Sequence, residues 1–109
     1  EYGKMNYRSF IPNPVFAETY REALSETGLT ESNVGEREGL YSSDIGNVSH
    51  IVPSLHVELQ LQDDIVWHSP PFAEATIGKR SKEFLEEAVT LNSLAVYRLL
   101  TKKGLLEKA

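Results

Sequence analysis

The residues best suited to chemistry are three histidines, His50, His56 and His68, with Asp44, Glu58, Asp63 and Asp64 close to them in sequence. Neutral imidazole and carboxylate groups are natural ligands of zinc in hydrolytic sites. Their spacing matches no compact zinc signature, such as two histidines one helical turn apart. The pattern therefore leaves two interpretations open. Incidental surface histidines are favoured over a self-contained metal site built from the histidines and Glu58.

A second group of polar residues, Ser42, Ser43 and Asp44, lies just before His50. No glycine-x-serine-x-glycine elbow frames either serine, which argues against a serine nucleophile. Both hydroxyls are better suited to hydrogen bonds with a substrate carboxylate or carbonyl. Ser42 and Ser43 are therefore candidates for substrate binding, and no residue is assigned a catalytic role.

Composition narrows the function classes. The formal net charge of -5 over 109 residues argues against nucleic-acid binding, because no basic face can neutralise phosphates. The absence of cysteine excludes disulfides and thiolate sites. No apolar run approaches the roughly 20 residues that span a bilayer, and no leader opens the chain. We therefore expect a cytoplasmic protein with no membrane partner. Because Glu1 rather than methionine comes first, we also expect a piece of a longer protein.

Two amphipathic helices should frame these polar residues. Asn13-Pro14 is a cap followed by proline at the first helical position, and Gly28 is a typical stop, which predicts a helix over residues 14–26. A stripe of apolar residues predicts a second helix over residues 81–103, with Ser81 as its cap and Gly104 as its end. The members of this stripe are Leu85, Ala88, Leu91, Ala95 and Leu99.

Between the helices, residues 55–62 alternate between apolar and polar side chains, which is typical of a half-buried strand. His56 and Glu58 share its polar face, which we interpret as solvated rather than metal-binding. Residues 2–10 read as a short strand or a linker, and residues 29–40 as loop. Residues 41–50 are rich in small polar residues and are better suited to a pocket than to a core. Because a residue before proline is extended, the chain after His68 is expected to be stiff and non-helical. The order of elements predicts an α/β fold.

Three ordered motifs carry a resemblance to a known family: residues 41–49 (YSSDIGNVS), 52–54 (VPS) and 68–75 (HSPPFAEA). Their order resembles the C-terminal part of the aminoacylase and carboxypeptidase family of zinc amidohydrolases. The branch of p-aminobenzoyl-glutamate hydrolase-like and dipeptidase-like proteins looks closest. Tyr41 stands where many relatives carry glycine.

The resemblance implies the C-terminal part of a catalytic domain, a mixed sheet flanked by helices, here as a fragment. Residues 1–10 would end a lid or dimerisation domain or form the crossover, and residues 11–109 would belong to the catalytic domain. His68 would be a ligand of a centre of two divalent metal ions, zinc by family. Ser42, Ser43 and Asp44 would lie against the substrate. The parent would be a homodimer.

The implied activity is metal-dependent hydrolysis of an amide in an acyl-amino acid, a p-aminobenzoyl-glutamate-like compound or a dipeptide. The family's upstream histidine-x-aspartate ligand pair is missing from this chain. A catalytic zinc ion needs about three protein ligands, so we expect the isolated chain to be inactive without the remainder of the catalytic domain. The alternative is a small acidic interaction domain with no catalytic role.

Overall fold

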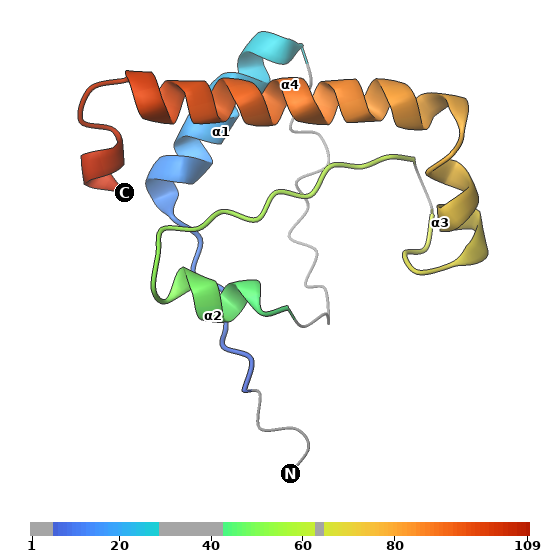
Figure 1. Ribbon diagram of the computed structural model, residues 1–109, viewed down its shortest axis with the longest axis horizontal. Coiled ribbons are helices and arrows are strands. Elements are labelled where there is room, and N and C mark those ends of the chain that lie inside the picture. The colour runs from blue at the N-terminus through green and yellow to red at the C-terminus, as the bar shows by residue number, and fades with distance from the viewer. Residues whose placement is uncertain (1–5, 29–42, 63–64) are drawn as a thin grey trace.

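The computed structural model describes residues 6–28, 43–62 and 65–109. Along the chain these contain α1 (Pro14–Thr27), α2 (Ile45–Ser49), α3 (Pro70–Ala75), α4 (Lys79–Thr101) and a 3-10 helix, η1 (Leu106–Lys108). The longest helix, α4, crosses α1, and in this view the C-terminal end of α1 projects beyond it, whereas α2 and α3 lie on the opposite side (Figure 1).

The predicted first helix is confirmed as α1, one residue longer than expected. The Oδ1 atom of Asn13 accepts hydrogen bonds from the backbone N–H groups of Val15 and Phe16, both at 3.0 Å. At the other end Gly28 is left-handed, with a φ of 75°, a conformation that glycine adopts without a steric penalty. Asn13 also ties the helix to distant segments. Its N–H donates to Ser54 O at 2.8 Å, and its Nδ2 donates to Ala109 O at 2.7 Å.

The second predicted helix is confirmed as α4, but both of its ends lie two residues earlier than expected. Gly78 is its N-cap, so Ser81 lies inside the first turn, where its hydroxyl donates to Gly78 O. The helix ends at Thr101, and Gly104 turns the chain in a left-handed conformation with a φ of 75°.

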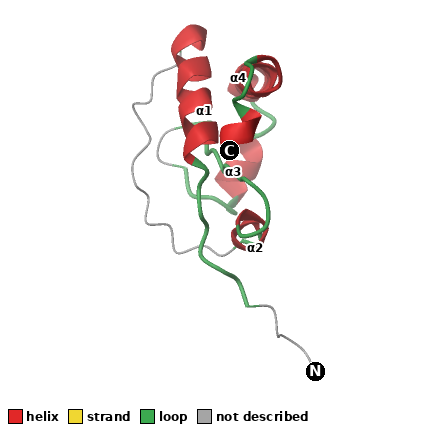
Figure 2. Cartoon of the chain, turned by 90° about the vertical axis from the view of Figure 1, so that its left-hand side faces the viewer, coloured by secondary structure: helices red, strands yellow, loops and turns green. Residues whose placement is uncertain are grey.

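The core forms where α1 packs on α4 (Figures 1 and 2). Tyr20 and Ala23 of α1 and Leu91 and Ala95 of α4 are its buried residues. Five partly buried residues pack around them: Leu24, Leu55, Val57, Leu59 and Leu94. Of the predicted stripe on α4, Leu91 and Ala95 are buried, Ala88 and Leu99 are half-buried, and Leu85 is exposed.

The expectation of an α/β fold with a mixed sheet is wrong for the part of the chain that the structure describes, which is helical and contains no strand. Residues 53–60 form an extended segment beneath α4 (Figure 1). The predicted alternation is nevertheless present, with Leu55, Val57 and Leu59 half-buried and His56 and Glu58 exposed. A strand requires a second extended backbone at its side, whereas this segment lies beside helices. One-sided packing on α1 and α4 is enough to produce the alternation.

Residues 6–12 contain no strand. Of the two interpretations of residues 2–10, a short strand or a linker, the strand is therefore wrong for the residues that the structure describes. The short helix α2 lies in the stretch expected to line a pocket, and α3 lies where non-helical chain was expected. In α3 the extended Ser69 is the N-cap, its Oγ accepts a hydrogen bond from Phe72 N at 3.3 Å, and Pro70 is the first helical residue. The expectation of non-helical chain after His68 was wrong because a serine before a proline also begins a helix.

None of the helices in the described residues is both long enough and apolar enough to cross a membrane.

Candidate functional site

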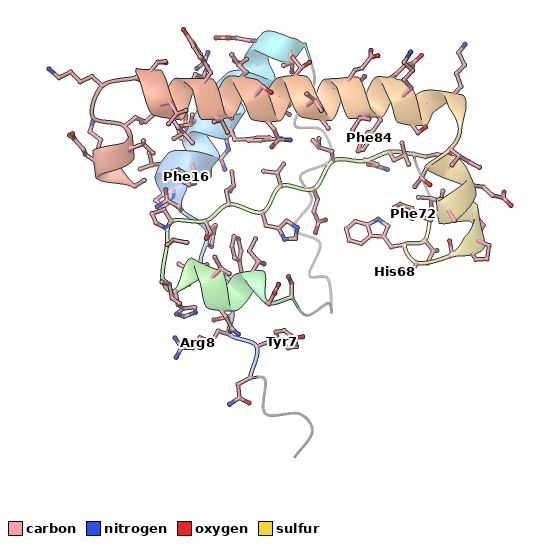
Figure 3. The ribbon with its side chains drawn as sticks, viewed as in Figure 1. Tyr7, Arg8, Phe16, His68, Phe72 and Phe84 are labelled. Atoms are coloured by element: carbon pink, nitrogen blue, oxygen red, sulfur yellow. The ribbon has the colours of Figure 1, made fainter. Side chains whose placement is uncertain are left out.

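His68 lies in the turn between the extended segment and α3, and its side chain is exposed (Figure 3). Its φ is 58°, and within residues 6–28, 43–62 and 65–109 it is the only residue other than glycine with a positive φ. Ser69 closes this turn, because its hydroxyl donates to Val66 O and accepts from Phe72 N. His68 is therefore presented by a closed turn directly before a capped helix.

Of the predicted substrate residues, Ser43 and Asp44 lie together at the start of α2, and Ser42 lies outside the described residues. Ser43 is half-buried and its Oγ accepts a hydrogen bond from Ile45 N at 3.3 Å. Asp44 is exposed, and its carboxylate does not cap the helix. The structure places His68 apart from this pair, on the α3 side of the molecule (Figures 1 and 3).

The other two histidines contact residues of the N-terminal segment. His50 Nε2 lies 3.0 Å from Ser9 O, and the ring of His56 lies edge-on to Phe10 with centroids 6.5 Å apart. Over the described residues, no three histidine, aspartate or glutamate side chains gather closely enough to hold a metal ion. The self-contained site of His50, His56, His68 and Glu58 is thus not assembled.

A set of contacts that the sequence did not predict joins α2 to residues 8–11. Asn47 Oδ1 accepts from Arg8 N at 2.8 Å, and Ser49 Oγ accepts from Ile11 N at 3.0 Å. Gly46 is buried against the same segment, and a Cβ atom there would lie 2.0 Å from Arg8 O. We call Gly46, Asn47, Ser49 and His50 the backbone clamp, since each contacts main-chain atoms of residues 8–11. The small polar residues of this stretch were its only signal in the sequence.

An open groove of about 380 Å³ lies between α1, α2, the extended segment and α4. None of its lining residues is charged: Phe16, Tyr20, Ile45, Val48, Pro53, Ser54, Leu55, Val57, Asn92, Ala95, Val96 and Leu99. Burial raises the pKa of the Tyr20 hydroxyl, which finds no hydrogen-bond partner in the described part of the chain. Asp44 precedes the groove residue Ile45, so the candidate substrate residues adjoin the groove in sequence.

The charged side chains with the clearest geometry stabilise helices and lie outside this groove. Arg98 of α4 pairs with Glu22 at 2.8 Å and with Glu26, both on α1. Within α4, Arg80 makes two hydrogen bonds of 2.7 Å to the carboxylate of Glu87. The Arg98 pairs join α4 to α1, and the Arg80 pair stabilises the first part of α4. None of these side chains is free to bind a metal or a substrate.

Comparisons of the chain with protein-family models, with curated proteins and with solved structures found no match.

Proposed function

We propose that this chain is the C-terminal part of a metal-dependent amidohydrolase and supplies His68 as one metal ligand. The proposal rests on the resemblance of the three ordered motifs and on one structural observation, the left-handed backbone of His68. A left-handed conformation costs a non-glycine residue about 1 to 2 kcal/mol, and residues held in this way cluster at functional sites. The residue that carries this cost is the one that the motif assigns to the metal.

The described residues do not form a zinc site by themselves. A catalytic zinc ion requires about three protein ligands, and His68 belongs to no group of three or more such side chains in the described part of the chain. The role that we propose for this chain is therefore to present an exposed imidazole, with the remaining ligands and the general base on other polypeptide. Ser43 and Asp44 would contact an acyl-amino acid, a p-aminobenzoyl-glutamate-like compound or a dipeptide.

The test begins with the coding sequence upstream of Glu1, where the proposal expects a histidine-x-aspartate pair and a glutamate base. In the protein expressed with that region, His68→Ala should lower bound zinc and amide hydrolysis together. Because even the outer partners of metal ligands change affinity by about 10- to 100-fold, we expect a loss of at least about a hundredfold. His56→Ala is the matched control and should retain both zinc and activity.

Two results would overturn the proposal. One is full zinc content and activity in the His68→Ala protein. The other is hydrolysis by the purified 109-residue chain above its own His68→Ala control, since a single ligand cannot support the reaction.

The alternative is an acidic interaction domain without catalysis, and the exposed apolar side chains of α4 favour it. Leu85, Val89 and Leu100 are each more than half exposed. Contiguous exposed apolar surface marks a protein contact. A nearby start codon, with no histidine-x-aspartate pair upstream of Glu1, would support this alternative.

A further inference from the structure

Residues 8–11, which we call the strap, are held on α2 by their main chain. Arg8 N donates to Asn47 Oδ1 at 2.8 Å, and Ile11 N donates to Ser49 Oγ at 3.0 Å. Both donors are backbone N–H groups, which every residue except proline provides. These two hydrogen bonds therefore require only that neither position of the strap is a proline.

Two further contacts of the backbone clamp also involve main-chain atoms of the strap. His50 Nε2 lies 3.0 Å from Ser9 O, and because a carbonyl oxygen can only accept, this ring nitrogen carries the proton. Gly46 has no Cβ, and one there would lie 2.0 Å from Arg8 O. Glycine thus lets the second backbone approach closely. The clamp offers two acceptors, one donor and an open surface to a backbone that passes over it.

The side chains of the strap take little part in this contact. Arg8 and Ser9 are exposed, and Ile11 is 51% exposed. Phe10 is half-buried, but its ring lies edge-on to His56, which is outside α2. The hydrogen bonds of the clamp therefore recognise a backbone rather than a sequence.

The side chains of the clamp are oriented by hydrogen bonds within α2. The Ser49 hydroxyl donates to Gly46 O at 2.7 Å, so its lone pairs are left to accept. Asn47 N and Val48 N donate to Asp44 O at 2.9 and 3.2 Å, which fixes the turn that carries the Asn47 amide. Such preorganisation lowers the entropic cost of binding.

The spacing of the two donors indicates the backbone form that fits the clamp. Arg8 and Ile11 are three residues apart, yet both of their N–H groups face α2. In a β-strand, groups three residues apart point in opposite directions. A polyproline II chain repeats every three residues and leaves its N–H and C=O groups free. Pro12 favours an extended conformation at Ile11. We propose that the backbone clamp is a binding site for extended peptide chains of this form, and that the strap is its intramolecular ligand.

The strap is held in a way that allows exchange. Its three hydrogen bonds lie at the surface, where water competes for both partners and the net gain of each bond is small. The strap prevails because it is tethered, which gives it an effective concentration on the order of millimolar. The clamp is thus closed to dilute peptides and becomes available when the strap is weakened.

The test uses the full 109-residue chain with Arg8→Pro and Ile11→Pro, which removes both donors of the strap and leaves α2 unchanged. The probe is an acetylated and amidated heptapeptide with the sequence of residues 6–12, added during heteronuclear NMR of the α2 amides. We expect saturable shifts in this opened chain, with an affinity at least about tenfold above that of the wild type, where the strap competes. Arg8→Ala with Ile11→Ala is the matched control. It keeps both N–H groups and should stay as closed as the wild type.

Two further peptides test whether the backbone is what binds. A heptapeptide that is N-methylated at the positions of Arg8 and Ile11 lacks the two donors and should not bind. A heptapeptide with alanine at both positions keeps them and should bind within about threefold of the first peptide. Asn47→Ala with Ser49→Ala in the opened chain should weaken binding by at least about tenfold, because both acceptors are lost.

A measurement on the unaltered chain is independent of the proline variant. The heptapeptide at ~10 mM, above the effective concentration of the strap, should displace it. Water-exchange NMR should then show faster hydrogen exchange at the Arg8 and Ile11 amides and no change at Leu91 in the core. If the α1 and α4 signals show that the opened chain is unfolded, this measurement decides alone.

Three results would overturn the proposal. The first is the absence of saturable shifts in the folded opened chain, or unchanged exchange in the wild type where that measurement decides. The second is equal binding of the N-methylated peptide, since the donors would then be irrelevant. The third is wild-type binding as tight as that of the opened chain, which would place the peptide elsewhere. None of these results depends on His68 or on amide hydrolysis.

Discussion

His68 has a backbone conformation that its own residue type does not favour. Its φ of 58° lies in the left-handed region, which histidine enters more often than most residues but less readily than glycine. The capped α3 that follows and the hydrogen bond from Ser69 to Val66 hold the turn in place. The conformation is thus maintained by its neighbours, at a cost to the stability of the chain.

That cost can be measured by substitution. His68→Gly should give a chain more stable than His68→Ala by about 1 kcal/mol, because glycine has no Cβ to clash in the left-handed region. Urea unfolding of the two variants gives the comparison directly. If the alanine variant were the more stable, the turn would not hold this φ in solution.

Gly46 is the second residue whose identity has a clear physical reason. A Cβ atom at this position would lie 2.0 Å from Arg8 O, a backbone atom that cannot rotate away. Gly46→Ala should therefore push residues 8–11 off α2 and destabilise the chain by about 1 to 3 kcal/mol.

Trypsin provides the local readout for this change. Cleavage after Arg8 should be faster in Gly46→Ala, since the segment would lose its hydrogen bonds to Asn47 and Ser49. Gly78→Ala is the control, because its Cβ would lie 3.3 Å from the nearest atom, Ala75 O. Equal cleavage rates in wild type and Gly46→Ala would show that the backbone clamp does not hold residues 8–11.

At the scale of elements, the long helices were predictable because their signals are local. Asn13, Pro14 and Gly28 define α1, and the apolar stripe defines α4 to within two residues. The short helices were missed because five or six residues contain too few apolar positions to establish a helical period. The alternating burial of the segment around Leu55 was predicted correctly, but the prediction that this segment forms a strand was wrong. Sheet pairing depends on a neighbouring backbone, which no local pattern reveals.

The candidate site could be predicted only in part from the sequence, for the same reason. Histidine is a recognisable ligand type, so His68 could be singled out. Its left-handed backbone is held by the turn around Ser69, whereas its separation from Ser43 and Asp44 follows from how α2 and α3 are placed, which no residue type encodes. The backbone clamp was not predicted because Asn47 and Ser49 bind main-chain atoms, whose positions the sequence does not specify.

The ion pair of Arg80 and Glu87 within α4 predicts that the stability of the folded chain depends on pH in the acidic range. Hydrogen bonding to the Arg80 guanidinium lowers the pKa of Glu87 below its ordinary value. A carboxylate whose pKa is lower in the folded state stabilises the fold above its ordinary pKa, and this contribution is lost as the pH falls through the folded value. Glu87→Gln should therefore lower the melting temperature near neutral pH. The melting temperature of this variant should also change less as the pH falls.

Melting curves recorded from neutral pH down to about pH 3 give the comparison. The effect should be small, because both side chains are on the surface. Glu86→Gln is the matched control, since no ion pair of Glu86 is seen in the described residues and Arg80 is left untouched. An identical acid dependence in wild type and Glu87→Gln would contradict the assignment.

At the scale of the whole molecule, stability rests on a small core between α1 and α4. Leu91 is fully buried in it, whereas Leu85 on the same helix is largely exposed. Leu91→Ala should cost about 2 to 5 kcal/mol, a large share of the roughly 5 to 15 kcal/mol that stabilises an ordinary domain. Leu85→Ala, measured by urea unfolding under the same conditions, should change stability by only about 0.5 kcal/mol. Equal losses would mean that Leu85 is as well covered as Leu91 in the folded chain.

The packing of α1 on α4 joins two helices that are far apart in the sequence, and this has a consequence for biosynthesis. Tyr20 and Ala23 leave the ribosome long before Leu91 and Ala95, the residues that bury them. Until α4 has been synthesised, the apolar side of α1 lacks its native packing partner, and closing the long loop between the two helices carries an entropic penalty. The core between them can therefore form only after α4 has left the ribosome.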